Sequence, residues 1–443
     1  MKCTRSRLMS SEALPLRWLR TFFCGTIAVT VAASLGCRPL TDIDAPDLVA
    51  PSSLDNATGA SARYAGGISD FAAAYTEQIL ETGLLTDEFQ DVGDNAYSSD
   101  RRVISSANNY PFADLSRARI SGLRAIMTLR RFAPSPPQRI GELYALVGFI
   151  EVMLGENVCA PIPLATLVDG LPVAAPPLDS DALVDDALAL FDSAAKYSGD
   201  TDTVSNLARL GRARALLLRG DVQAAASAAL GVPGEFKYSI PYSASTAGQN
   251  NGVYARIGIL RSMSVSDSEG VNGLPFVSGT DSRIGADSLG ISRSNHPLFN
   301  FAKDGGLGAP VVLASGVEAA LIRAEAALSS GKIVEWAGIL NALRRTAISP
   351  AVAPLPDDST VEASPELQVD VVFHERAFWL FGTGHRQGDL LRLMRRYDRL
   401  PESTFPTGDY EPTPGVTYGT SILFMPSGEE PNLDYHGCMG GGA

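Results

Sequence analysis

Positive charge is scarce in this sequence. Its 36 lysines and arginines stand against 49 aspartates and glutamates, so the formal net charge is −13 at pH 7. Nucleic-acid binders need a basic patch or stripe to neutralise phosphates, and this composition argues against that class. Long apolar runs are also scarce: beyond residue 36, no stretch reaches the roughly 20 apolar residues that cross a bilayer. The chain is still 443 residues long and 45% hydrophobic, which is enough for a large core.

Motifs for catalysis and metal binding are missing as well. The stretch HERAF begins like the zinc-protease pattern H-E-x-x-H, but Phe378 stands where the second histidine would be. The four histidines are too scattered to indicate zinc. GTGHRQG has the wrong spacing for a dinucleotide loop, and no G-x-S-x-G occurs. We therefore predict no cofactor, no metal and no enzymatic activity. A glycan-cleaving acid pair stays a hypothesis because carboxylates are plentiful, although no motif singles out a pair.

The N-terminus predicts export. Basic residues precede an uncharged apolar stretch at 21–36, which is short for a membrane span but suits the core of a signal peptide. It ends in AASLGC, which resembles a bacterial lipobox, although Ser34 stands where leucine is common. That resemblance implies a signal peptide over 1–36, acylation of Cys37 and a lipid-anchored tether over 37–60. The alternative is ordinary cleavage that leaves Cys37 as a free thiol.

Two of the five cysteines are left for a disulfide. Cys3 and Cys24 leave with the signal peptide and Cys37 takes the lipid, so Cys159 and Cys438 remain. An exported protein meets an oxidising compartment, and two spare thiols then favour one bond. The alternative is two free buried thiols.

Helical periodicity dominates the rest of the chain and predicts a mainly α fold. Periodic segments cover about 62–90, 112–133, 139–154 and 178–197. The block at 207–229 is repeated at 321–345, so that Leu210 falls on Leu321 and Gly220 on Gly331. This pattern resembles tetratricopeptide (TPR)-like helix pairs, although any alanine-rich helical hairpin would look similar. We predict a single domain over 61–443, with a loop-rich segment at 233–312 and an irregular tail at 400–443.

A group of charged residues near the C-terminus is interpreted as structural. Helical spacing places Arg386, Asp389 and Arg392 on one face, with one carboxylate between two guanidiniums. Together with Glu375 and Arg376 on the preceding helix, they predict an interhelical polar clasp rather than a catalytic site.

This stretch also resembles the C-terminal signature of the SusD/RagB nutrient-uptake lipoproteins, E-R-x-x-E-L-x-F-E-G-H-R-W-F-D-L-x-R. The matching residues are Glu375, Arg376, Leu380, Gly384, His385, Arg386, Asp389, Leu390 and Arg392. The departures are Trp379, Gly382, Thr383, Gln387 and Gly388, which indicate a divergent branch. TDEF at 86–89, the block at 323–344 and TDSR at 280–283 agree with the family.

The resemblance implies a helical scaffold of four TPR-like pairs with a ligand site in the loops on the other side. It further implies a surface-exposed, outer-membrane lipoprotein with a lipid as its membrane anchor. Such a protein would pass an oligosaccharide or peptide to a SusC-like, TonB-dependent barrel. A second hypothesis is a TPR-like periplasmic adaptor lipoprotein that binds a protein partner.

Ligand-binding candidates are chosen from the loops. They are Asp94, Asn95, Tyr97, Arg101, Tyr254, Arg256, Phe276 and Phe299. Aromatic rings can stack on sugars, whereas charged and amide groups can bind hydroxyls. For each aromatic residue the alternative is packing in the core. Trp336 and Trp379 lie in helical segments, so no tryptophan platform for sugars is evident and peptides stay open.

Overall fold

The structure, a computed structural model, describes residues 51–93, 98–105, 110–199, 203–301, 303, 305–356, 363–413, 415–426 and 434–437. The chain divides into two units, Met1–Pro51 and Ser52–Ala443, and apart from Pro51 all elements below belong to the second. The predicted signal peptide and Cys37 lie outside the described residues. The first long helix begins at Ala57, where the side chain of Asn56 accepts a hydrogen bond from Gly59 N. The folded body therefore starts a few residues before the predicted end of the tether.

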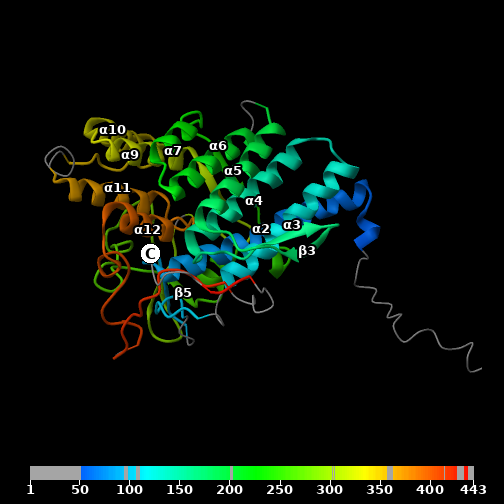
Figure 1. Ribbon diagram of the computed structural model, residues 1–443. Coiled ribbons are helices and arrows are strands. Elements are labelled where there is room, and N and C mark those ends of the chain that lie inside the picture. Colours follow the sequence, from blue (N-terminus) through cyan, green and yellow to red (C-terminus); the bar gives the residue numbers. More distant parts are fainter. Residues whose placement is uncertain are drawn as a thin grey trace, which may run out of the picture. The chain divides into compact units, whose positions relative to one another are not determined.

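Pairs of consecutive helices form the scaffold (Figure 1). Within the described ranges these pairs are α2 (Ala57–Leu85) with α3 (Tyr110–Phe132), α4 (Gln138–Asn157) with α5 (Ser180–Lys196), α6 (Thr203–Arg219) with α7 (Val222–Ala229), and α9 (Gly316–Ser329) with α10 (Ile333–Thr346). The prediction of a mainly helical fold with TPR-like pairs is confirmed. The two repeated sequence blocks are the last two pairs, and α7 packs directly against α9.

Glycines terminate helices in these pairs and allow neighbouring helices to pack closely. Gly220 and Gly331 follow α6 and α9 with φ values of +90° and +66°, a conformation that residues with a Cβ rarely adopt. Gly211 on α6 faces Phe191 of α5 so closely that a Cβ would lie 2.1 Å from the ring. The absence of a side chain at Gly211 therefore allows α5 and α6 to pack closely.

Two further helices complete the scaffold. α11 (Pro365–Trp379) begins after Ser364, whose side chain accepts a hydrogen bond from Leu367 N. It is followed by a tight turn and then by α12 (Arg386–Tyr397). Gly382 and Gly384 give this turn its shape, with φ values of +67° and +71°. The turn lies on α2, where a Cβ on Gly384 would meet the side chain of Gln78 at 2.4 Å.

Short antiparallel strand pairs make up the loop-rich part of the described chain. They are β1 (Phe89–Asp91) with β5 (Met263–Val265), β2 (Ala165–Val168) with β3 (Leu171–Ala174), β4 (Lys237–Ile240) with β8 (Val311–Ser315), and β6 (Ser288–Ile291) with β7 (Pro297–Phe299). Short helical turns lie among them: η1 (Pro51–Leu54), η2 (Ala247–Gln249), α8 (Gly252–Tyr254), η3 (Ala255–Ile259) and η5 (Pro401–Ser403). The described part of 233–312 is thus an insertion with its own strands and turns between the last two helix pairs. The described tail is held by isolated bridges such as Val158↔Phe424.

The core joins the helical side to the loop side. The predicted apolar face of the first helix, which includes Phe71, Tyr75 and Ile79, is buried. The Tyr75 hydroxyl lies 2.7 Å from Val312 O on β8 and 3.1 Å from Thr383 O in the turn before α12. One side chain of α2 therefore connects the insertion to the C-terminal turn. No helix among the described residues is long and apolar enough to span a membrane.

Candidate functional site

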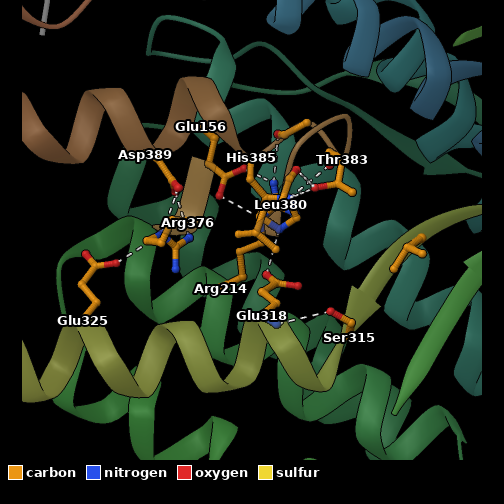
Figure 2. Close-up of polar contacts among 12 residues, drawn as sticks. Glu156, Arg214, Ser315, Glu318, Glu325, Arg376, Leu380, Thr383, His385 and Asp389 are labelled. Carbon is orange, nitrogen blue, oxygen red and sulfur yellow. Dashed lines mark hydrogen bonds and ion pairs between the residues drawn. The ribbon is translucent and has the colours of Figure 1, made fainter. Parts of the chain in front are cut away.

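A buried ionic network surrounds α12, the part of the chain that carries the C-terminal signature (Figure 2). Arg376 of α11 forms two hydrogen bonds of 2.9 Å with Asp389. Arg392 donates to Asp389 at 2.8 Å and forms a second pair, at 3.0 and 2.9 Å, with Glu325 of α9. Burial alone would raise the pKa of Asp389, but Arg376 and Arg392 outweigh it and hold that pKa far below its usual range. Asp389 is therefore a permanent anion between two cations.

The network continues through His385 to helices α4, α6 and α9, which come earlier in the sequence (Figure 2). Its Nε2 lies 3.0 Å from Glu318 Oε1 of α9 and 3.1 Å from Arg214 Nη1 of α6. Arg214 in turn pairs with Glu156 of α4 at 2.9 and 2.5 Å. Burial raises the pKa of Glu318, but the attraction of His385 and the nearby arginines outweighs it, so this pKa lies below its ordinary value. Four helices thus meet through charged side chains.

The remaining clasp residues bind outside the predicted group. Arg386 pairs with Asp87, in the TDEF stretch after α2, at 2.6 and 2.8 Å. Glu375 pairs with Arg344 of α10 and lies 2.9 Å from Arg283 Nη1 in the insertion. The prediction that Asp389 lies between Arg386 and Arg392 is therefore wrong for Arg386. Arg376 takes that place because the side chain of Arg386 turns toward α2.

All five predicted clasp residues are buried, and their partners are charged groups of the same protein. A buried guanidinium that is paired with a carboxylate has its charge neutralised, and its burial leaves a ligand no access to it. This arrangement supports the interpretation as a clasp that holds helices and loops in position. Within the described residues, no group of three or more His, Cys, Asp or Glu side chains could hold a metal ion.

The loop side contains a second cluster, of buried carboxyl groups without a matching number of cations. Asp100 accepts hydrogen bonds from the Tyr410 hydroxyl and from Asp91 N. Glu269 accepts from the Tyr418 hydroxyl at 2.9 Å and from Ser266 at 2.7 Å. Asp100 lies in the early loop, the segment between α2 and α3, and Glu269 lies in the insertion. Their two carboxyl groups therefore connect these segments to the C-terminal tail. We call Asp100, Glu269, Tyr410 and Tyr418, with the nearby Glu81, the carboxyl cluster.

Burial raises the pKa values of the carboxyl groups in this cluster. It raises the pKa of Asp100 and of Glu269 well above the ordinary range. Repulsion from Asp91 raises the pKa of Asp100 further, and repulsion from Asp100 raises that of Glu269. Burial also raises the pKa of Glu81, which accepts a hydrogen bond from Ser99, from its ordinary 4.5 to about 7. Since the folded protein binds this proton more tightly than the unfolded chain does, Glu81 contributes its full stabilisation below pH 4.5 and loses it as the pH rises through about 7.

We expect the tail to detach from the loop side more readily at pH 8 than at pH 5, because ionising the carboxyl cluster places uncompensated negative charge inside the protein. Amide hydrogen exchange at 405–424, corrected for intrinsic rates, should therefore rise between these values. Asp100→Asn, which keeps an acceptor but cannot ionise, should make the rise smaller. Glu335→Gln on exposed α10 is the matched control and should leave it unchanged. An equal rise in the Asp100 variant would contradict the assignment.

Tyr254 and Arg256 are the predicted ligand residues that the structure brings together. They lie on α8 and η3, both half-buried, next to the middle of α2. Arg256 is close enough to Glu77 and Glu81 for its charge to oppose the rise that burial causes in the pKa of both carboxyls. Just beyond η3, Leu260 is 57% exposed. This corner therefore combines an aromatic ring, a guanidinium and the half-buried carboxyl group of Glu77 with exposed apolar surface.

The other predicted ligand residues are spread more widely. Arg101 is half-buried in the early loop, and Phe299 on β7 is half-buried beside β5, where its N–H donates to Ser264 Oγ at 2.9 Å. Phe276 is fully buried against Phe378 and Phe381, so its prediction as a ligand contact is wrong and packing in the core is the correct alternative. Asp94, Asn95 and Tyr97 lie outside the described residues. The same holds for Cys438, so its bond to Cys159 stays a prediction.

The sequence reasoning missed Glu77, Glu81, Asp100 and Glu269. The signal for the first two was available, because polar residues interrupt the buried side of an otherwise apolar helix. For the other two, no local pattern separates a buried acid from an exposed one in a polar loop.

Known structures show which class of fold this is. A SusD-like carbohydrate-binding protein from Bacteroides vulgatus matches with a TM-score of 0.57 at 13% identity, over 76% of this chain and 83% of its own. A SusD superfamily protein from the same species matches with a TM-score of 0.61 at 14% identity, over 84% and 96%. A SusD/RagB family protein from Bacteroides thetaiotaomicron matches with a TM-score of 0.54 at 12% identity, over 76% and 88%.

The chain therefore has the SusD-like fold. No protein-family model and no curated protein matches the sequence. The fold that the C-terminal signature led us to expect is thus confirmed.

Proposed function

We propose that this protein is a non-enzymatic, surface-exposed binding lipoprotein of the outer membrane. It captures an oligosaccharide on its loop side and delivers it to a TonB-dependent, SusC-like transporter. The fold is the observation that carries this proposal, since one protein with the same fold is described as carbohydrate-binding. The signal-like N-terminus with Cys37 supports export and lipid anchoring.

The corner formed by α8, η3 and α2 is the proposed ligand site. The ring of Tyr254 can lie against the apolar face of a sugar, while Arg256 and Glu77 can donate to and accept from its hydroxyls. The carboxyl cluster and the ionic network then act as support, because they fix the insertion and the early loop to the scaffold. Asp94, Asn95, Tyr97, Arg101 and Phe299 remain proposed contributors.

Binding can be measured by calorimetry against a panel of oligosaccharides and oligopeptides. For a ligand that binds, we expect Arg256→Ala to weaken the affinity by about tenfold or more, because hydrogen bonds to a charged group contribute about 1.5–3 kcal/mol. Val334→Ala, at an exposed apolar position on α10, is the control and should change nothing. If only peptides bind, the proposed ligand is a peptide and not a sugar. If Arg256→Ala leaves the affinity unchanged, the ligand site lies elsewhere.

Delivery to a transporter is tested by purifying the native lipoprotein from its own outer membrane and identifying what accompanies it. A stoichiometric TonB-dependent barrel is the expected result. Recovery with soluble periplasmic proteins instead would favour the adaptor hypothesis.

A further inference from the structure

The hairpin of β2 and β3 presents an apolar face to solvent. Its register pairs Val168 with Leu171 and Thr166 with Val173, so these four side chains share one face. Val168, Leu171 and Val173 are 52%, 65% and 46% exposed. Isolated exposed apolar residues are ordinary, but three on one face of a short hairpin form a patch.

Two arginines of α3 hold this hairpin against the helix. Arg119 Nη1 donates to Ala165 O at 2.7 Å, and Arg124 Nε donates to Gly170 O at 3.0 Å, at the hairpin turn. The hairpin is therefore attached at both ends and presents its apolar face in a fixed position. Met127 and Arg131, three and seven residues after Arg124, lie on the same side of the helix and are exposed.

The charge of α3 is opposite to that of the protein. The helix contains five arginines and a single acidic residue, Asp114, in a chain of net charge −13. Arg117 is paired with Asp114, and Arg119 with Glu151 and Asp186. Exposed Asp169 lies at the hairpin turn. Arg130 and Arg131, both exposed near the end of the helix, leave a local excess of positive charge beside the apolar patch.

The start of the described chain lies at the same end of the molecule. α2 runs beside α3 (Figure 1), and Arg63 near the start of α2 donates to Thr128 near the end of α3 at 3.0 Å. The 13 residues 38–50 lie between Cys37 and the described chain, so Cys37 is at most about 50 Å from Pro51. A lipid on Cys37 would thus keep this end of the protein close to a bilayer.

We propose that the exposed face of the β2–β3 hairpin, with the arginines of α3, docks on the surface of an anionic membrane. The inference rests on the proposed lipid anchor. Apolar side chains that insert at the level of the headgroups, next to arginines that contact phosphates, are the combination that binds such a surface. The lipid retains the protein at the membrane, and this face sets its orientation there.

The test uses the full lipidated protein on phosphatidylcholine vesicles with and without phosphatidylglycerol, both containing brominated acyl chains that quench tryptophan. Leu171→Trp reports on the hairpin and Val334→Trp on exposed α10, with the wild-type signal subtracted. We expect strong quenching of the first variant on anionic vesicles and little quenching of the second. Adding Arg130→Gln and Arg131→Gln, which leaves the arginines that hold the hairpin in place, should lower the docking equilibrium about 30-fold, at slightly more than about fivefold per arginine.

The proposal is overturned if both tryptophans are quenched equally. It is also overturned if the quenching does not depend on lipid charge or on the arginine substitutions. Quenching that requires another outer-membrane protein would overturn it as well, because the face would then bind protein. The mass of the Cys37 peptide verifies acylation in the same sample. Ligand affinity measured there reports separately on the proposed function, so the two can fail independently.

Discussion

Replacing Asp389 by asparagine should lower the free energy of unfolding by about 3–5 kcal/mol, the usual cost of removing one partner from a buried ion pair. Asp389 is 2% exposed and is shared by Arg376 and Arg392. Asparagine has nearly the same shape but no charge, so two buried guanidiniums would lose the anion between them. Glu325 would still neutralise Arg392, whereas Arg376 would keep only a longer contact of 3.7 Å to Glu325.

Denaturant titration followed by fluorescence measures this effect. Asp192→Asn is the matched control, because Asp192 pairs with Arg212 at 2.7 Å but its side chain is 61% exposed. Exposed pairs contribute about 0–1 kcal/mol, so this variant should unfold almost like the wild type. If the two variants lose similar stability, the buried network does not hold the helices as we infer.

Phe381→Ala should cost about 3–5 kcal/mol, since it removes a large ring from the core and leaves a cavity. The Phe381 ring lies 5.5 Å from Phe89 on β1, 4.8 Å from Phe276 in the insertion and 5.2 Å from Phe301. These contacts join the end of α11 to the two segments that carry the loop side. We therefore also expect faster amide exchange in β1 and β5 than in α4, which lies away from the cavity.

The comparison that isolates this effect is Phe381→Leu, which keeps most of the apolar volume and should lose clearly less stability. Thermal unfolding gives the stability and hydrogen exchange by mass spectrometry gives the local effect. An equal loss of protection from amide exchange in α4 and β5 would show that the aromatic contacts of Phe381 support the whole fold and not the loop side in particular.

The helical scaffold was readable from the sequence because its signals are local. Apolar residues at helical spacing predicted α2, and the glycines after α6 and α9 marked the ends of the repeated helices. Strand pairing carried no such signal: Phe89 pairs with Val265, far along the chain, and neither three-residue strand is long enough to show alternation. These pairs form because the scaffold brings the loops together.

The same division applies to the functional residues. The Asp389–Arg392 pair was predictable because it spans one helical turn, whereas Arg386 binds Asp87 across the fold. Phe276 and Tyr254 are both aromatic residues in a loop-rich segment, and only burial distinguishes the core residue Phe276 from the half-buried candidate Tyr254.

The pairing of β4 with β8 has a further consequence. Lys237 lies opposite Ser315, so the insertion leaves the scaffold and returns to it at neighbouring positions. The helix pairs on either side contact each other directly through α7 and α9. An inserted segment with adjacent ends can change in length and sequence at little cost to its host, because the loop-closure entropy rises slowly with length. The segment between these strands can therefore be exchanged as a unit while the helical frame stays the same, and a graft of it would carry the proposed ligand residues Tyr254 and Arg256 with it.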